Sequence, residues 1–212
     1  MSYQSKDRRP IPVRENPLSK RTAKLLTRAG VSANLISSLS LLFGVGAGIC
    51  LMMTSSQPGV RLWWALAAVL ILLRLLANML DGMVAMETGE TSAVGELFNE
   101  VPDRISDAAT FIGAGFAAAS SVHLGYMAAI LALLVAYTRA LGNQMGVTGL
   151  FIGPMSKQQR MFTLIVICLF YAIVPFAWQS LPLLILGLWA INLGSIITFI
   201  RRIRLIVKEM NR

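Results

Sequence analysis

Six long apolar stretches constrain the fold of this chain more than any other feature. They cover about residues 33–54, 62–86, 96–120, 124–144, 159–177 and 181–200. A helix needs roughly 20 apolar residues to cross the hydrocarbon core of a membrane, and irregular backbone cannot face lipid. With 56% hydrophobic and 14% charged residues, the chain is also more apolar than a water-soluble domain of 212 residues needs to be. The stretches predict an all-α integral membrane protein with six transmembrane helices.

Basic residues bracket this apolar part. Of 19 Lys and Arg residues, eight lie in the first 28 positions and five in the last twelve. An even number of spans places both termini on one side, and cytoplasmic segments carry the excess of Lys and Arg. We therefore expect a multi-pass protein with both termini in the cytoplasm. Nucleic-acid binding is the alternative explanation, but basic flanks of apolar spans more often signal topology and contact with membrane lipids, so we expect no nucleic acid.

The chain before the first span has a different character from the rest. Residues 17–30, PLSKRTAKLLTRAG, place Leu18, Leu25 and Leu26 among basic residues. This pattern is typical of an amphipathic helix that lies in the membrane interface. We expect a basic cytoplasmic or interfacial segment over residues 1–30 and one six-helix membrane domain over 31–212. Within the first span, the glycines of GVGAG (44–48) favour close helix packing over nucleotide binding.

Acidic residues are concentrated where the second stretch ends and the third begins. Seven of the ten Asp and Glu residues lie in 78–107, NMLDGMVAMETGETSAVGELFNEVPDRISD. On the second predicted helix, Asn78, Asp81 and Ala85 share one face, because they are three and four residues apart. On the third, one face repeats every four residues, at Gly95, Asn99, Asp103 and Asp107. The two faces can meet across one cavity.

Two of these acids stand out because apolar sequence follows them. Ionisable groups at membrane depth are costly and usually face a wet cavity or a partner. A solvated acidic loop is the alternative; it explains Glu87, Glu90 and Glu96 but not Asp103 and Asp107, which lead into TFIGAGFAAA. Facing carboxylates repel unless a cation lies between them, and clustered oxygen ligands suit Mg²⁺ or Mn²⁺. The arrangement therefore indicates a divalent metal site.

The same residues resemble the signature of the CDP-alcohol phosphatidyltransferase family, D-x2-D-G-x2-A-R-x8-G-x3-D-x3-D. All spacings match without a gap, at Asn78, Asp81, Gly82, Ala85, Met86, Gly95, Asn99 and Asp103. The entry segment VSANLIS (31–37) also looks like that of the family, as do YTRALG (137–142) and GPMSKQQR (153–160). The chain departs from the signature at Asn78, Asn99 and Met86, where the family has two aspartates and an arginine. Either Glu100 and Asp107 replace the lost charge, or fewer metal ions bind.

The resemblance implies an enzyme of phospholipid biosynthesis in the inner, cytoplasmic membrane. Such a transferase moves a phosphatidyl group from CDP-diacylglycerol, or a related CDP-alcohol, to a polar or lipid alcohol and releases CMP. It also implies Mg²⁺ or Mn²⁺ as cofactor, an active site that faces the cytoplasm, and a homodimer. A non-catalytic family member that binds a CDP-lipid or serves as a scaffold is one alternative. An ion or proton carrier is another, but the outer halves of the predicted spans are uniformly apolar.

The resemblance also implies a role for each site residue. The expected metal ligands are Asn78, Asp81, Asn99, Asp103 and Glu100. Asp103 is the expected catalytic base, with Asp107 as its substitute. The expected donor-binding residues are Gly82, Ala85, Gly95 and Arg74. The expected acceptor-binding or phosphate-binding residues are Arg139, Lys157 and Arg160.

Three of these expectations leave alternatives open. Arg74, deep in an apolar stretch, needs an anionic partner, which is either a nearby acid or an oxygen of a lipid or pyrophosphate. Lys157 and Arg160 bind phosphate or serve only as topology signals. Pro102 either kinks the third helix or marks its first turn.

Overall fold

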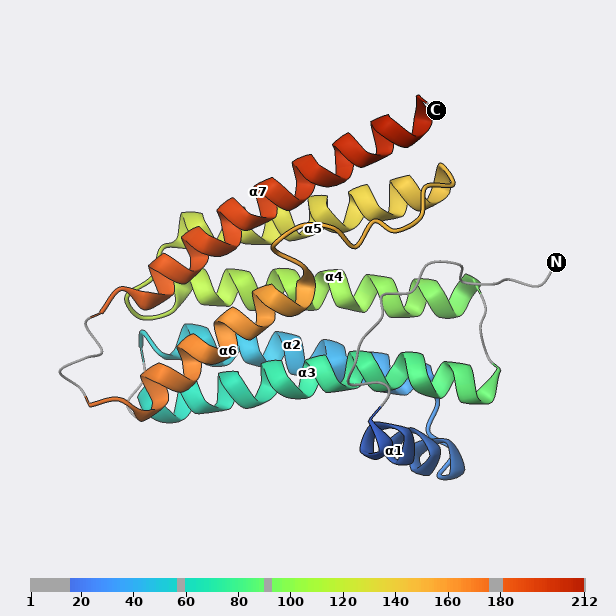
Figure 1. Ribbon diagram of the computed structural model, residues 1–212. Helices are drawn as coiled ribbons and strands as arrows, with labels where there is room; N and C mark the ends of the chain where they lie inside the picture. The colour runs from blue at the N-terminus through green and yellow to red at the C-terminus, as the bar shows by residue number, and fades with distance from the viewer. Residues whose placement is uncertain (1–15, 57–59, 90–92, 176–180, 212) are drawn as a thin grey trace.

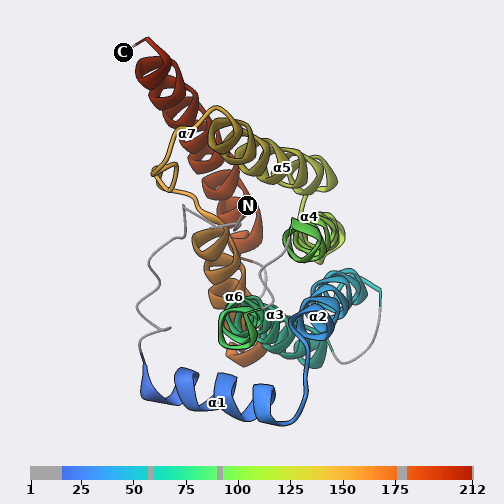
Figure 2. The same ribbon diagram turned by 90° about the vertical axis from the view of Figure 1, so that its right-hand side faces the viewer.

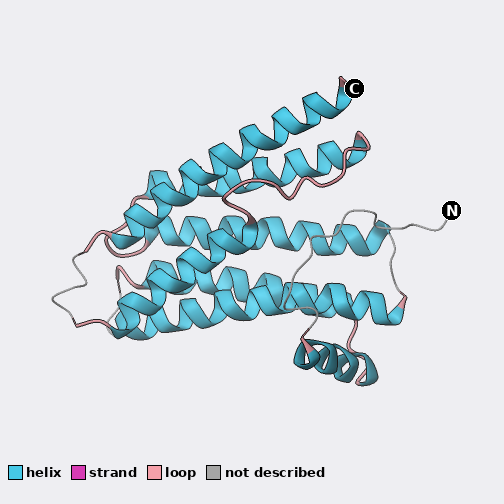
Figure 3. Cartoon of the chain, viewed as in Figure 1, coloured by secondary structure: helices cyan, strands magenta, loops and turns pink. Residues whose placement is uncertain are grey.

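The computed structural model describes residues 16–56, 60–89, 93–175 and 181–211 (Figure 1). Within these ranges the chain forms seven helices and no strand (Figure 3). The helices are α1 (Pro17–Arg28), α2 (Ala33–Met53), α3 (Val60–Thr88), α4 (Ala93–Phe116), α5 (Val122–Gln144), α6 (Lys157–Ile173) and α7 (Leu183–Met210). The prediction of an all-α protein is confirmed.

Helices α2 to α7 coincide with the six predicted stretches, with shifts at their ends. Four of them, α2, α3, α5 and α7, are long and apolar enough to cross a membrane. Helix α6 has only 17 residues, and α4 carries the acidic and basic residues of the predicted site. The crossing of all six helices therefore stays a prediction. Helix α7 continues ten residues beyond the predicted end at 200, because the basic sequence that follows is a good helix former outside the apolar segment.

Helix α1 forms where the amphipathic pattern predicts a helix. The side chain of Asn16 accepts a hydrogen bond from the backbone N–H of Leu18 (3.0 Å), and Pro17 occupies the first turn, where its missing N–H costs nothing. The helix lies across the direction of the bundle, beside the end of α3 (Figure 2). Its buried Ala23 packs in a small apolar cluster that includes Ala77 and Val84, whereas Leu18 and Leu25 are exposed. Its position in a membrane interface stays a prediction.

Small residues bring α2 and α4 close together. A Cβ atom added at Gly48 would collide with the backbone of Ala109, and one at Gly113 would collide with the backbone of Gly48. A Cβ at Gly44 would collide with the side chain of Ser106. Close backbone approach of this kind is typical of helix pairs in membranes. The GVGAG segment therefore serves helix packing, and this packing fixes α4 beside the helices that carry the other motif residues.

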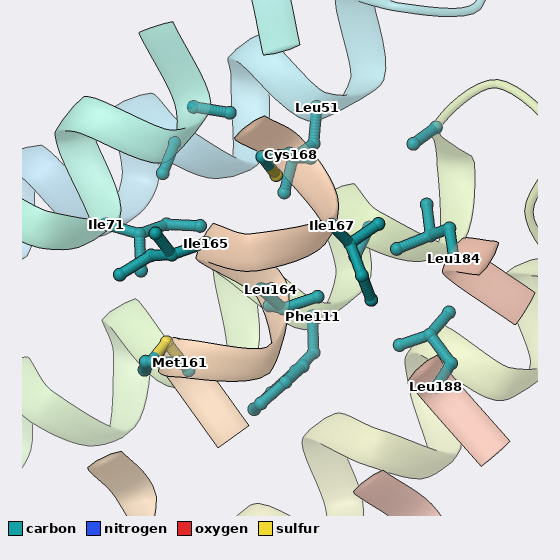
Figure 4. Packing of buried hydrophobic residues seen from close by; sticks show 14 of the residues in the cluster. Leu51, Ile71, Phe111, Met161, Leu164, Ile165, Ile167, Cys168, Leu184 and Leu188 are labelled. Carbon is teal, nitrogen blue, oxygen red and sulfur yellow. The ribbon is translucent and has the colours of Figure 1, made fainter. Parts of the chain in front are cut away.

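The main hydrophobic core surrounds α6. Figure 4 shows Leu164 and Ile167 of this helix among side chains from neighbouring helices, including Phe111 of α4 and Leu188 of α7. Tyr171 of α6 stacks on Trp64 of α3, with ring centroids 4.8 Å apart. Helix α6 thus packs against both halves of the bundle, and its first turn carries Lys157 and Arg160.

The connection between α5 and α6 folds back over the bundle before α6 begins (Figure 1). Thr198 of α7 accepts a hydrogen bond from the backbone N–H of Met155 (3.0 Å). Gly153 has a φ of 114°, which favours glycine, and it lies against Thr198. The buried Arg202 of α7 donates to the carbonyl oxygens of Val135 (2.6 Å) and Ile152 (3.4 Å). These contacts set the position from which α6 starts.

Candidate active site

Two motif residues of α3 are held by serines of α2. The hydroxyl of Ser37 donates to Asp81 Oδ2 (2.8 Å), and the backbone N–H of Gly82 lies 2.5 Å from Asp81 Oδ1. The hydroxyl of Ser40 donates to Asn78 Oδ1 (2.6 Å). Asp81 is 2% exposed and interacts electrostatically with Asp103 and Lys157. The first half of the motif is thus fixed from the side of α2.

Asp103 of α4 lies between cations from two other helices. Its Oδ2 forms an ion pair with Lys157 Nζ, at the start of α6. Its Oδ1 lies 3.7 Å from Arg74 Nη2 of α3 and, within the described part of the chain, accepts no hydrogen bond. A buried carboxylate oxygen without a hydrogen bond is unfavourable unless a further group binds it. This oxygen is therefore free to bind a metal cation or to accept a proton from a substrate.

Asp107 lies one helical turn further into the bundle and is almost completely buried. Its Oδ1 pairs with Arg74 Nη2, and its Oδ2 lies 3.5 Å from Arg160 Nη2 of α6. The exposed fractions of the Arg74 and Arg160 side chains are 0% and 2%, so both guanidinium groups are internal. Arg74 also donates to Ser106 and to the backbone carbonyl of Asp103 (3.3 Å). Of the two alternatives for Arg74, the structure shows the ion pair with a nearby acid.

Glu100 occupies the more open side of the same cluster. Its Oε2 is 2.5 Å from Arg104 Nη2, one turn along α4, and its Oε1 is 2.6 Å from Arg139 Nη2 on α5. The Arg139 guanidinium also lies over the ring of Phe151, 5.9 Å from its centroid. The exposed side-chain fractions are 41% for Glu100 and 32% for Arg139. Both carboxylate oxygens of Glu100 are thus engaged by arginines.

The remaining candidate residues line the two motif helices. Asn99, Gly82, Ala85 and Gly95 are all partly buried, whereas Met86, at the position of the family arginine, is 63% exposed. Pro102 lies inside α4, which begins at Ala93, so the alternative that it marks the first turn is wrong. Proline has no N–H to donate to the preceding turn, and it therefore weakens the helix at the site.

The structure adds residues that the sequence pattern did not single out. Ser37 and Ser40 are three residues apart in an apolar helix, and that spacing on one face is a signal that could have revealed them. Arg104 directly follows a motif aspartate, and it pairs with Glu100. Arg202 lies in the basic C-terminal segment, yet it is buried and donates hydrogen bonds to two backbone carbonyls.

The donor atoms present fit a divalent cation, though with few charges. Among the described residues, no three Asp, Glu, His or Cys side chains gather as a metal-binding group. Asp81 and Asp103 supply two carboxylates, and Asn78 and Asn99 can add amide oxygens; such hard oxygen donors suit Mg²⁺ or Mn²⁺. The buried Asp103 Oδ1, which has no hydrogen-bond partner among the described residues, fits a bound cation. Which side chains bind metal, donor or acceptor stays a prediction.

Three similarities to known proteins are found at the level of sequence. A sequence profile described as CDP-alcohol phosphatidyltransferase matches residues 30–200. A phosphatidylinositol phosphate synthase of Streptomyces avermitilis is 26% identical over 194 residues, which cover 88% of this chain and 77% of that protein. An uncharacterized protein of Aquifex aeolicus is 34% identical over 178 residues, which cover 82% of this chain and 81% of that protein.

The fold resembles that of a solved enzyme. The phosphatidylinositol phosphate synthase of Mycobacterium tuberculosis with CDP-DAG bound has a TM-score of 0.74 to this chain at 23% identity, over 90% of this chain and 94% of that one. The form of that enzyme in complex with manganese and citrate has a TM-score of 0.73, also at 23% identity, over 89% and 88% of the two chains. The architecture described above is therefore shared with that enzyme.

Proposed function

The chain belongs to the CDP-alcohol phosphatidyltransferase family, whose members are metal-dependent enzymes of phospholipid synthesis, and we propose that its donor is CDP-diacylglycerol and its acceptor a hydroxyl compound. The family assignment supports phosphatidyl transfer from a CDP-alcohol. The observation that carries the finer proposal is the position of Asp103. It is the last aspartate of the signature, and one of its oxygens is buried without a hydrogen bond among the described residues.

In the proposed reaction, the acceptor oxygen attacks the phosphorus atom that carries diacylglycerol. A new P–O bond forms, the bond from this phosphorus to the bridging oxygen breaks, and CMP leaves with that electron pair. The hydroxyl proton passes to the carboxylate of Asp103. Lys157, paired with Oδ2 of the same carboxylate, orients Asp103 for this step.

The proposed metal ligands are Asp81 and Asp103, with Asn78 and Asn99 as neutral donors. A divalent ion held there would neutralise phosphate charge and polarise the phosphorus under attack. Ser37 restrains Asp81, and Ser40 restrains Asn78, so α2 orients this half of the ligand set. Two carboxylates and two amides carry less charge than four carboxylates, which favours one tightly bound ion over two.

Glu100 and Asp107 receive different roles from those that the sequence indicated. Because arginines engage both oxygens of Glu100, we assign it to the basic side of the site and not to the metal. Asp107 lies between Arg74 and Arg160, and we propose that it holds these cations in place beneath Asp103. Asp103, the last aspartate of the signature, keeps the role of proton acceptor in this proposal. Arg74 then positions Asp107 and Asp103 and does not itself bind the donor.

We further propose that the site opens to the cytoplasm in the inner membrane. The basic ends of the chain support this orientation through the positive-inside rule. The ends of α3 and α5 and the starts of α4 and α6, which carry the site, then lie on the cytoplasmic side, where a CDP-lipid and a water-soluble alcohol can both reach it.

The proposal can be tested with purified protein in lipid nanodiscs. CDP-diacylglycerol, MgCl2 or MnCl2 and one alcohol at a time are added, and the lipid products are identified by mass spectrometry. We expect a new phosphatidyl-alcohol in proportion to the CMP released. A panel of sugar, polyol, amino-alcohol and lipid acceptors that yields neither product nor CMP would contradict the proposal.

A further inference from the structure

Glu100, Arg104 and Arg139 form the part of the charged cluster that is most open to solvent. The side chains of Glu100 and Arg139 are 41% and 32% exposed, and that of Arg104 is 22% exposed. In contrast, the exposed fractions in the Arg74–Asp107 and Arg160–Asp107 pairs do not exceed 2%. A water-soluble acceptor that approaches Asp103 therefore meets the Glu100 group before the internal pairs.

Two guanidinium groups that converge on one carboxylate make an anion site that is already filled. Arg104 and Arg139 each place an Nη2 atom within 2.6 Å of a Glu100 oxygen. Arginine presents a planar fork that also suits a phosphate group. A phosphate on the acceptor would have to displace a carboxylate that is tethered to α4 and is therefore always present. The phosphate would then lie beside the displaced carboxylate, and the two negative groups would repel each other.

We propose that Glu100 is an internal substitute for an anion at this position and determines specificity: it selects alcohols without a phosphate group and rejects phosphorylated ones. This inference rests on the proposed transfer reaction and names the class of its acceptor. This chain would then differ in its class of acceptor from the relatives named as phosphatidylinositol phosphate synthases.

The opposite role for Glu100 is physically possible and gives the opposite result. A carboxylate can orient an arginine so that another of its N–H groups binds a phosphate. In that case, removal of the Glu100 charge would impair the use of a phosphorylated acceptor. If Glu100 instead occupies the anion position, removal of its charge frees two guanidinium groups and improves that use.

The test compares Glu100→Gln with wild type on matched acceptors. Glutamine keeps the size of the side chain and removes its charge. CMP release gives kcat/KM for glycerol and sn-glycerol 3-phosphate, and for inositol and inositol phosphate. We expect Glu100→Gln to shift the ratio toward the phosphorylated partner by about tenfold, as one charge-assisted hydrogen bond gained by the phosphate would do. Glu87→Gln removes the charge of an exposed acid outside the cluster and should leave the ratio unchanged.

A binding measurement separates this inference from the transfer reaction. Inorganic phosphate should raise the unfolding temperature of Glu100→Gln more than that of wild type or Glu87→Gln, whether or not any variant releases CMP. Absence of CMP with every alcohol would refute the transfer reaction alone. A kcat/KM ratio that is unchanged, or that shifts toward the unphosphorylated acceptor, would overturn the role of Glu100, as would equal phosphate stabilisation in all three proteins. Glu100→Ala provides a second variant with the same expected shifts.

Discussion

The guanidinium of Arg74 on α3 and the carboxylate of Asp107 on α4 form an ion pair closed off from solvent, with exposed side-chain fractions of 0% and 1%. The pair joins the two helices that carry the motif, and Arg160 of α6 approaches the same carboxylate at 3.5 Å. Three helices thus meet at one internal charge. Because each charge is stabilised mainly by the other, neither can be removed cheaply.

The first prediction concerns this pair. Asp107→Asn leaves Arg74 and Arg160 without their shared counter-ion, and we expect a loss of about 3–5 kcal/mol in unfolding free energy, typical of a broken buried pair. Thermal unfolding in detergent gives the measurement, with Glu87→Gln as the control of equal charge change. The double variant Arg74→Met/Asp107→Leu should recover part of the loss. A stable Asp107→Asn protein without CMP release would instead assign Asp107 to the chemistry.

The second prediction concerns the contact of α2 with α4. Gly48→Ala adds a Cβ atom that collides with the backbone of Ala109, so the two helices must separate. We expect a destabilisation of about 1–3 kcal/mol, as for other forced overpacking. Gly46→Ala is the matched control, because its Cβ would lie 3.4 Å from the flexible end of Leu70. Equal unfolding temperatures for the two variants would contradict close packing of α2 on α4.

The third prediction concerns the asparagines of the motif. Asn78→Asp with Asn99→Asp adds two negative charges to the proposed ligand set, and each charge strengthens attraction for a divalent ion. We expect the concentration of Mg²⁺ or Mn²⁺ that gives half-maximal thermal stabilisation to fall by at least about tenfold. Glu87→Gln, which changes the charge outside the cluster, tests for a general effect of charge. No change in the metal dependence would place the cation elsewhere.

The fourth prediction concerns the connection that leads into α6. Thr198→Val removes the hydroxyl that accepts from Met155 N–H, two residues before Lys157. We expect a loss of about 1 kcal/mol in stability and a larger proportional fall in kcat, because Lys157 is no longer held on Asp103. Thr163→Val, on the exposed side of α6, is the control. A fall in stability with unchanged kcat would limit Thr198 to a structural role.

The positions of the helices could be predicted from the sequence because each apolar stretch reports its own helix. The end of α4 at Phe116, four residues before the predicted end at 120, could not, because a turn with Ala119 at a φ of 52° breaks an apolar run. The continuation of α7 to Met210 could not be predicted from hydropathy alone either, because basic residues interrupt the apolar sequence after residue 200.

Which helix faces meet could be predicted from the sequence, whereas the ion pairs between them could not. Helical spacing predicted that Asp81 and Asp103 lie on faces that can meet. In the structure, the two carboxylates lie close enough for their charges to interact. The pairing of Glu100 with Arg104 follows helical spacing, but its pairing with Arg139 depends on the rotation of α4 relative to α5, because Arg139 is 39 positions away. The same holds for Arg202, whose carbonyl partner Val135 is 67 positions away. Such contacts emerge only once the helices pack.

Metal-dependent CMP release by Asp103→Asn is the decisive measurement. The variant keeps the shape of the side chain and removes the proposed proton acceptor, so kcat for release of CMP from CDP-diacylglycerol should fall by at least about 10²-fold. Because the change also removes the counter-ion of Lys157, the unfolding temperature is measured beside kcat to show that the variant is folded at the assay temperature, and Glu87→Gln should match wild type. A purified, folded Asp103→Asn protein that turns over CDP-diacylglycerol at the wild-type rate would contradict the assignment of the active site.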